Sequence, residues 1–141
     1  MTQLTGKWAL ESIENFDAYQ KAIGVDDANR AKGNDLLCRT GADPTTEELT
    51  FTATTGKRIL TAGGQSQGGK EFPLNVEFEC PTLDGRKTKC KIVAESATKI
   101  VRYDTYENGV QGTQTSELVG DKMKTTMTAG GVTSTRVSKR V

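Results

Sequence analysis

An arginine flanked by serines near the C-terminus is the first feature that suggests chemistry. In VTSTRVSKRV (132–141), strand alternation puts Val132, Ser134, Arg136 and Ser138 on one face. Neither face of this strand is apolar, so the strand is a poor cover for a dry core. A guanidinium beside hydroxyl groups can bind a carboxylate or sulfonate. Spacing alone leaves two interpretations open: Arg136 points into a wet interior, or it points outward into solvent.

The residues that most often perform catalysis are missing. Histidine, the commonest general base and metal ligand near neutral pH, is absent from the chain. The motifs GxxxxGK(S/T), GxGxxG and GxSxG, which cradle phosphates or form nucleophile elbows, do not occur. An isomerase can be built inside a barrel, but we cannot assemble an acid and a base from these residues. We therefore expect a protein that is not an enzyme and that has no cofactor.

The cysteines do not indicate a metal site or a disulfide framework. There are three, Cys38, Cys80 and Cys90, an odd number without paired zinc spacing. We expect all three to be reduced thiols in a reducing compartment, with no metal bound.

Length and charge limit the partners. The 141 residues fit a single domain, 1–141, with room for a substantial core. The 19 Lys and Arg residues against 18 Asp and Glu give a net charge of +1, which provides no field for nucleic acid. No apolar run approaches the ~20 residues of a membrane span, and nothing resembles an export signal. We expect a cytoplasmic protein.

Short alternating segments separated by turn dipeptides run from about residue 45 to the C-terminus, which is typical of an antiparallel meander. Asp84-Gly85 and Asn108-Gly109 suit the positive φ of tight hairpin turns. The stretch AGGQSQGGK (62–70) is expected to form a long glycine-rich hairpin tip. The expected strands are about 6–10, 47–54, 57–63, 70–79, 86–94, 98–106, 110–119, 122–129 and 132–140, with 36–39 as a candidate tenth.

Several of these strands have one face that mixes apolar and small polar residues. A tightly packed interior would more often use Leu, Ile and Val throughout, so we expect an interior built around something wet or removable. Lysines alternate with the inward residues of 86–94 and are expected to face solvent; contact with anionic membranes is an alternative role. The inward sets are Phe72, Leu74, Val76 and Phe78; Thr88, Cys90 and Ile92; and Met123, Thr125 and Met127, and the lysines are Lys87, Lys89 and Lys91.

Two short helices are expected between the first strand and the meander. In ENFDAYQKAIG (14–24), helical spacing aligns Phe16, Tyr19 and Ile23, with Gly24 as the stop. A second helix, DDANRAKG (26–33), would be capped by Asp26 or Asp27 and end at Gly33. Each helix is too short to be stable alone, so the pair must dock on the strands.

The pattern therefore predicts a mainly β fold: one strand, a helix-turn-helix, then antiparallel hairpins to the C-terminus. Closure of the sheet would remove edges that aggregate, and a barrel of about eight strands already has room for a small ligand. Ten strands would leave a larger cavity than these side chains fill.

Three blocks of the chain resemble a known family. They are GKWALESIENFDAYQKAIGV near the N-terminus, FPLNVEFECPTLDGRKTK in the middle and GDKMKTTMTAGGVTSTRVSKRV at the end. In order and spacing they resemble the intracellular lipid-binding proteins, which include fatty-acid-binding and bile-acid-binding proteins. The resemblance implies a ten-stranded antiparallel up-and-down clam barrel, a helix-turn-helix lid after the first strand, and a water-filled cavity for one or two amphipathic ligands.

Details of the resemblance favour the ileal and liver branch. QTSELVGDKM and RVSKRV are closest to that branch. The heart and adipocyte branch carries an Arg-x-Tyr pair in its last strand and another arginine two strands earlier. Here these positions hold Arg136-Val137-Ser138 and Ser116. The region AGGQSQGGKE also lacks that branch's portal phenylalanine, so its ligand contacts cannot be transferred.

The resemblance favours an inward Arg136 and suggests further wall residues. Arg102 and Asp104 would face inward as a buried pair if the family register holds, although a surface pair is the alternative. Tyr19 is first a packing residue of the lid helix and secondly a ligand contact. The expected ligand-binding residues are Arg136, Ser138, Gln114, Ser116, Met127, Thr125, Arg102 and Tyr19.

We therefore expect a monomeric intracellular carrier of fatty acids or bile-acid-like amphipathic anions, whose partner is a small hydrophobic ligand and not nucleic acid. The alternative is a retinoid or neutral-lipid carrier on the same barrel, in which Arg136 orders water or stabilises the fold. An extracellular lipocalin is disfavoured by the helical pair after the first strand.

Overall fold

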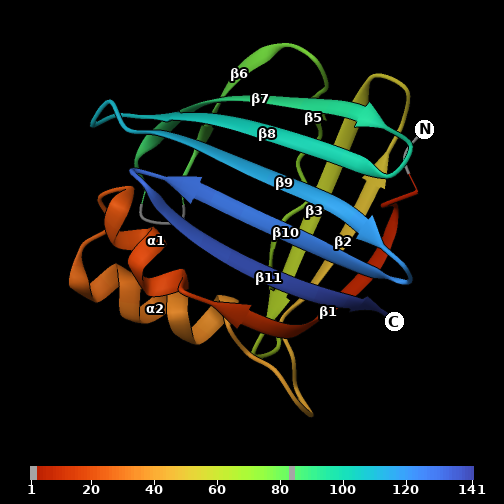
Figure 1. The fold of residues 1–141 in the computed structure, drawn as a ribbon, viewed down its shortest axis with the longest axis horizontal. Coiled ribbons are helices and arrows are strands. Elements are labelled where there is room, and N and C mark those ends of the chain that lie inside the picture. The colour runs from red at the N-terminus through yellow and green to blue at the C-terminus, as the bar shows by residue number, and fades with distance from the viewer. Residues whose placement is uncertain (1–2, 83–84) are drawn as a thin grey trace.

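A computed structural model describes residues 3–82 and 85–141, and the first half of the expected Asp84-Gly85 turn lies outside this range. Within these ranges, two helices follow the first strand, and every other element is a β-strand (Figure 1). The strands are β1 Gly6–Glu14, β2 Thr46–Phe51, β3 Thr55–Ala62, β4 Gln65–Gly68, β5 Phe72–Pro73, β6 Glu77–Pro81, β7 Lys87–Ser96, β8 Lys99–Tyr106, β9 Gln111–Val119, β10 Lys122–Ala129 and β11 Val132–Arg140. The helices are α1 Phe16–Ala22 and α2 Asp27–Leu37.

The strands form one curled antiparallel sheet. Hydrogen-bonded neighbours follow the order β4-β3-β2-β1-β11-β10-β9-β8-β7-β6, and β5 pairs with β3. The expected mainly β antiparallel clam with helices after the first strand is thus confirmed, with ten of the described strands along this order and the short β5 beside β3. The expectation that closure removes the edges is wrong, because this order leaves β4 and β6 at its two ends.

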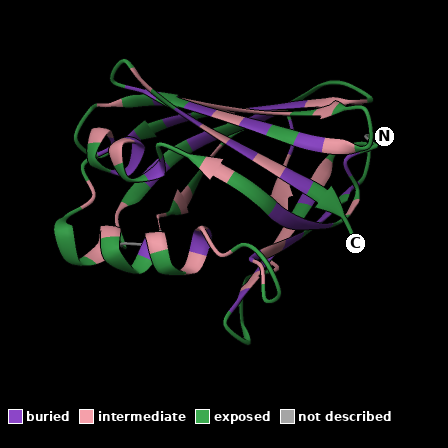
Figure 2. Cartoon of the chain, turned by 60° about the horizontal axis from the view of Figure 1, so that its bottom comes forward, coloured by how far each residue is buried: buried purple, intermediate pink, exposed green. Residues whose placement is uncertain are grey.

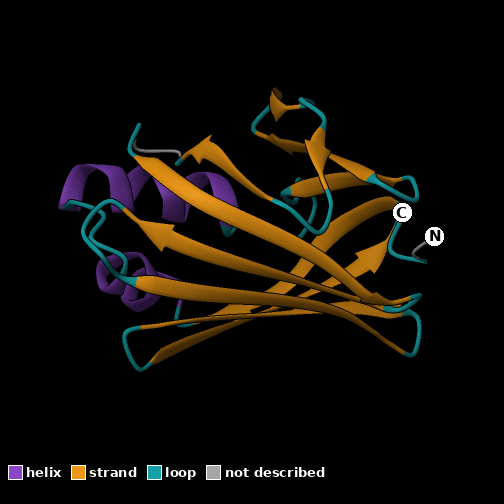
Figure 3. Ribbon diagram, turned by 90° about the horizontal axis from the view of Figure 1, so that it is seen from above, coloured by secondary structure: helices purple, strands orange, loops and turns teal. Residues whose placement is uncertain are grey.

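The helices lie together at one end of the sheet, and the C-terminus lies at the other end (Figures 1 and 3). α1 packs on β10 and β11, and its buried side includes Phe16 and Tyr19. Asp26 is the cap of α2, because its carboxylate accepts a hydrogen bond from the Asn29 backbone N–H at 2.8 Å. This placement means that the helices cover the sheet as the expected lid would.

The second helix differs from the sequence expectation. It continues through Gly33 to Leu37, so Gly33 does not end it and residues 36–39 are not a strand. Gly33 is buried within the helix because the Gln20 side chain of α1 packs against it, and a Cβ there would collide with the Gln20 amide. The small residue therefore serves the contact between the two helices.

Alternation of burial along the strands reproduces most expected faces (Figure 2). The inward sets of β7 and β10 are buried, and Lys87, Lys89 and Lys91 are exposed. The expected strand 70–79 is wrong: Asn75 has a φ of 66° and breaks it into β5 and β6. Val76 is consequently 52% exposed instead of facing inward. Residues 62–70 are also more regular than expected, because β4 pairs with β3.

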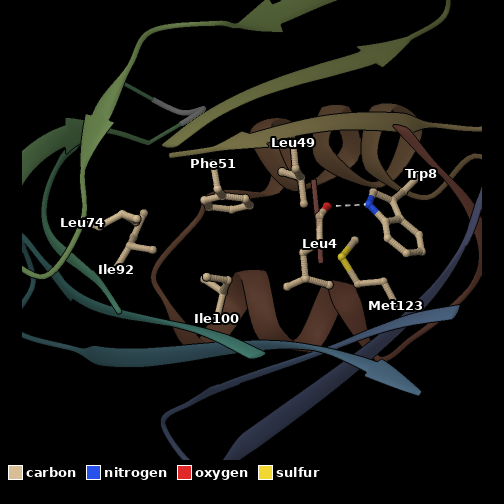
Figure 4. Close-up of a cluster of buried hydrophobic side chains, with 8 residues drawn as sticks. All are labelled: Leu4, Trp8, Leu49, Phe51, Leu74, Ile92, Ile100 and Met123. Atoms are coloured by element: carbon tan, nitrogen blue, oxygen red, sulfur yellow. Dashed lines mark hydrogen bonds between the residues drawn. The ribbon is translucent and has the colours of Figure 1, made fainter. Parts of the chain in front are cut away.

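Two apolar clusters occupy the interior. The cluster away from the helices brings side chains of opposite walls together, and the Trp8 indole donates a hydrogen bond to the Leu4 carbonyl at 2.9 Å (Figure 4). Its buried members are Leu4, Trp8, Leu49, Phe51, Leu74, Ile92, Ile100 and Met123. The cluster beneath the helices has the buried members Phe16, Tyr19, Ile23, Leu37, Leu60, Tyr106, Met127 and Ala129. Buried polar residues lie on strands that contribute to both clusters, and these polar residues form the candidate site.

Within the described ranges, none of the helices has the length and apolar character needed to cross a membrane.

Candidate ligand-binding site

The site is organised around Arg136 on β11. Its side chain is buried, with 8% of the residue exposed, so the inward interpretation is the one the structure supports. The guanidinium Nη2 lies 3.2 Å from the Glu47 carboxylate, which β2 contributes. Its Nε is buried and, among the described residues, has no hydrogen-bond partner. Arg136 is therefore paired with an internal counter-ion through Nη2, and its Nε–H remains available as a hydrogen-bond donor.

A second arginine shares that counter-ion. Arg58 on β3 donates from Nε to the other oxygen of Glu47 at 2.8 Å, and its side chain is 38% exposed. Burial alone would raise the pKa of Glu47, but the charges of Arg136 and Arg58 outweigh burial and lower the pKa. Burial lowers the pKa of Arg136, which stays protonated because a guanidinium titrates far above neutral pH. The three side chains together carry a net charge of +1.

Sheet register aligns further polar residues beside Arg136. Thr125 on β10 is directly opposite Arg136, and Ser116 on β9 is directly opposite Thr125. The hydroxyls of Ser116 and Thr125 are 3.0 Å apart and share a hydrogen bond. Ser138 is buried two positions after Arg136. These four residues are neighbours in the sheet, and their contact with a ligand stays a prediction.

Arg102 and Asp104 form a second polar group on β8. The Arg102 Nε donates to the Asp104 carboxylate at 2.7 Å, and the Asp104 side chain has no exposed surface. The Asp104 side chain is therefore fully buried and the Arg102 side chain partly buried, which agrees with the inward alternative. The same guanidinium contacts both Cys80 and Cys90, a feature that the sequence did not suggest.

Tyr19 connects the lid helix to the wall. Its hydroxyl lies 3.3 Å from the hydroxyl of Tyr106 on β8, and both residues are buried. Burial raises the pKa of Tyr19, so the phenol stays neutral and can donate a hydrogen bond. Gln114 and Met127, which oppose each other on β9 and β10, lie on the same wall. These residues surround the helix end of the interior rather than the Arg136 group.

The sequence analysis missed Glu47 and Arg58. A signal for Glu47 was present, because in TEELTF (46–51) it alternates with Leu49 and Phe51 on the buried face. A carboxylate in such a row needs a buried cation, and Arg136 was the obvious candidate. Arg58 had no comparable signal. Its side chain is only partly buried, so it is not a charged residue that stands out in a row of buried apolar residues.

Two lysines of the β7 row have acidic residues as cross-strand neighbours. Lys89 and Lys91 lie directly opposite Glu79 and Glu77 on β6. Cross-strand neighbours of opposite charge neutralise each other, which favours the solvated face. Membrane contact through this row stays a prediction.

Other features of the described residues provide no competing site. No group of three or more Cys, Asp or Glu residues there could hold a metal ion. An open hollow of about 270 Å³ lies over β6, β7 and β8, and Thr88 and Tyr106 are among its lining residues. It does not include the Arg136 group.

Comparison with known proteins decides the family. Residues 2–141 match the model of the lipocalin / cytosolic fatty-acid binding protein family. This chain belongs to that family. Its members are lipid-binding carriers rather than enzymes, as the sequence analysis expected.

Individual family members match over nearly their whole length. The liver fatty acid-binding protein of Sus scrofa is 33% identical over 97% of this chain and 98% of its own. Gastrotropin of Rattus norvegicus is 32% identical over 97% of each chain. The solved structure of the Schistosoma mansoni fatty acid binding protein in complex with arachidonic acid superposes with a TM-score of 0.84 at 29% identity, covering 100% of this chain and 98% of that one.

Proposed function

We propose that this chain is a monomeric, single-domain cytoplasmic carrier of a long-chain fatty acid or a bile-acid-like amphipathic anion. The head group binds at Arg136 inside a water-filled cavity, and the tail lies along the apolar clusters. The observation that carries this proposal is the buried Nε of Arg136, which lacks a partner among the described residues. An anionic oxygen can accept that hydrogen bond.

The charge of the site supports an anion. Glu47 neutralises one of the two arginines it contacts, so the Arg136, Glu47 and Arg58 group keeps one positive charge. A ligand carboxylate brings this group to neutrality, which reduces the cost of a buried charge. The family and the arachidonic acid complex of the schistosome protein support the same ligand class.

A second candidate is a retinoid or neutral-lipid carrier. The observation that favours it is the Arg136–Glu47 contact of 3.2 Å, because an arginine with an internal counter-ion does not require a ligand anion. In this alternative, Arg136 stabilises the fold and a hydroxyl or carbonyl head group accepts from its Nε.

Affinity for a matched acid and methyl ester separates the two candidates. If Arg136 binds the head group, Arg136→Gln removes a charge-assisted hydrogen bond worth about 1.5 to 3 kcal/mol, a loss of roughly tenfold to hundredfold for oleate. Methyl oleate is affected much less. Lys139→Gln is the control, because Lys139 is an exposed residue of the same strand. Calorimetry showing equal losses for acid and ester would exclude head-group binding by Arg136, and absence of saturable binding to any amphipathic anion would exclude the carrier.

A further inference from the structure

Two thiols lie against one guanidinium on the wall formed by β6, β7 and β8. Arg102 Nη2 is 3.4 Å from Cys80 Sγ and 3.2 Å from Cys90 Sγ. Since both sulfur atoms contact the same nitrogen, they are close neighbours. Asp104 fixes the guanidinium from its other side through a 2.7 Å hydrogen bond to Nε. The cysteines are therefore part of a positioned polar cluster.

The two cysteines differ in access. Cys80 is half-buried on β6, an edge strand, whereas Cys90 on β7 has no exposed surface. A small oxidant can therefore reach the partly exposed Cys80 before it reaches the buried Cys90.

They also differ in protonation. A hydrogen bond from the Cys90 thiol, together with the charge and hydrogen bond of Arg102, lowers the pKa of Cys80 to about 7. The hydrogen bond with Cys80 and burial raise the pKa of Cys90, which stays a thiol. A thiolate that is stabilised by a neighbouring thiol and a cation is the nucleophilic form of cysteine.

We propose that Cys80 and Cys90 form a peroxide-reactive dithiol, in which Cys80 is the nucleophile and Cys90 the resolving thiol. The Cys80 thiolate attacks the outer oxygen of a hydroperoxide, the O–O bond breaks, and the departing alkoxide or hydroxide takes a proton from water. This step leaves Cys80 as a sulfenic acid. Cys90 then attacks the Cys80 sulfur, an S–S bond forms, and the S–O bond breaks with release of water, which carries the Cys90 proton. The hydroperoxide is reduced by two electrons and the two thiols are oxidised by two.

The sheet permits this disulfide at its edge. Cys80 opposes Thr88 and Cys90 opposes Phe78, so the two cysteines are diagonal neighbours. Diagonal Cα atoms are typically ~7 to 8 Å apart, and a disulfide prefers less than about 7 Å, so bond formation requires a small shift. Among the described strands, β6 pairs with β7 alone, so it can make that shift without breaking a second ladder.

Cys38 provides an internal comparison. It is also half-buried, but burial raises its pKa, with Arg136 only partly opposing that effect. It follows helix α2 and does not belong to the Arg102 cluster. If access alone determined reactivity, Cys38 and Cys80 would react with peroxide at similar rates. The proposal predicts that Cys80 reacts much faster than Cys38.

The unmodified protein tests the first step. Hydrogen peroxide is added at a limiting amount, the remaining thiols are alkylated, and each cysteine is quantified by peptide mass spectrometry. We expect Cys80 and Cys90 to be lost together as a linked peptide pair that is lighter by two hydrogen atoms and is restored by dithiothreitol. Cys38 should remain reduced. Oxidation of Cys38 at the same rate as Cys80, or no thiol reacting faster than free glutathione, would overturn the proposal.

Variants assign the roles. Cys90→Ser should stop at a Cys80 sulfenic acid that dimedone traps, Cys80→Ser should protect Cys90, and Cys38→Ser should behave as the parent protein. Arg102→Gln should move the pH midpoint of iodoacetamide alkylation at Cys80 upward from about 7, whereas Arg102→Lys should move it less. An unchanged midpoint in Arg102→Gln would overturn the role of the guanidinium. None of these measurements needs a lipid, so their outcome is independent of the proposed carrier function.

Discussion

Arg136 and Glu47 lie 3.2 Å apart and form a buried ion pair that joins β11 to β2, the two strands that flank β1. Removal of either partner leaves a buried charge that only the remaining neighbours can compensate. Arg58 compensates Glu47 from its other oxygen, but Arg136 has no second carboxylate among the described residues. The two partners therefore differ. Glu47 competes with any ligand anion for Arg136, and when a ligand anion replaces Glu47 at Arg136, Glu47 can stay paired with Arg58.

This competition predicts that Glu47→Gln increases affinity for a carboxylate ligand. The variant removes a negative charge from the head-group site, and about 1.4 kcal/mol of relieved repulsion corresponds to a tenfold tighter complex. Calorimetry with oleate should show this gain, and methyl oleate should not. Glu48→Gln is the matched control, because the exposed Glu48 is adjacent on the same strand. Weaker oleate binding in Glu47→Gln alone would mean that Glu47 helps to bind the ligand.

The same pair predicts a defined pH dependence of stability. The pKa of Glu47 is lowered by its two arginines, so its contribution to folding is fully present above the ordinary value of 4.5 and is lost as the pH falls through the folded-state pKa. The difference in unfolding free energy between the parent and Glu47→Gln should be constant near neutral pH and shrink only below 4.5. Urea titrations of both proteins at several pH values measure this difference in unfolding free energy. A difference that already shrinks above pH 5 would contradict the assignment.

The contact between the helices predicts an unusual glycine effect. Alanine is a better helix former than glycine by about 1 kcal/mol, yet Gly33→Ala should destabilise the protein. The new methyl group would displace the Gln20 amide, which donates to the Asn34 side chain at 3.0 Å. Loss of that part-buried hydrogen bond and displacement of the buried Gln20 side chain should outweigh the propensity gain by about 1 kcal/mol. Thermal unfolding provides the measurement, and Lys32→Ala, at an exposed position of α2, should be neutral or stabilising.

Alternation and turn residues were sufficient to predict the meander, the inward faces of β7 and β10 and the helical pair. They failed where tertiary contacts override local pattern. Gly33 suggested a helix end because the contact with Gln20 is invisible in the sequence, and Asn75 interrupted a strand that otherwise alternates well. The pattern of residues around Arg136 left its direction open, and the family resemblance was needed to favour the inward side chain that is buried in the structure. The thiol cluster was not predictable, because it depends on the register between β6, β7 and β8.

The end of the lid helix is tied to the barrel at one carbonyl group. The Ile23 carbonyl, just after α1, accepts hydrogen bonds from Arg86 Nη1 at 2.8 Å and from the Asn108 side chain at 3.2 Å. Both donors lie at the ends of neighbouring hairpins, so they connect α1 to β7 and to the β8–β9 turn. If α1 is the lid, local opening must break these bonds first.

The last prediction is that Asn108→Ala combined with Arg86→Met accelerates ligand exchange. Each lost hydrogen bond lowers the opening free energy by about 1 kcal/mol, so opening should become roughly tenfold or more frequent. Entry and release use the same opening, so both rate constants should rise while the dissociation constant changes little. Stopped-flow binding of a fluorescent fatty acid measures both rates. Lys124→Met, at an exposed position of β10, controls for the loss of a surface charge. Unchanged rates in the double variant would show that ligands enter without moving α1, most directly between β4 and β6, the strands at the two ends of the sheet order.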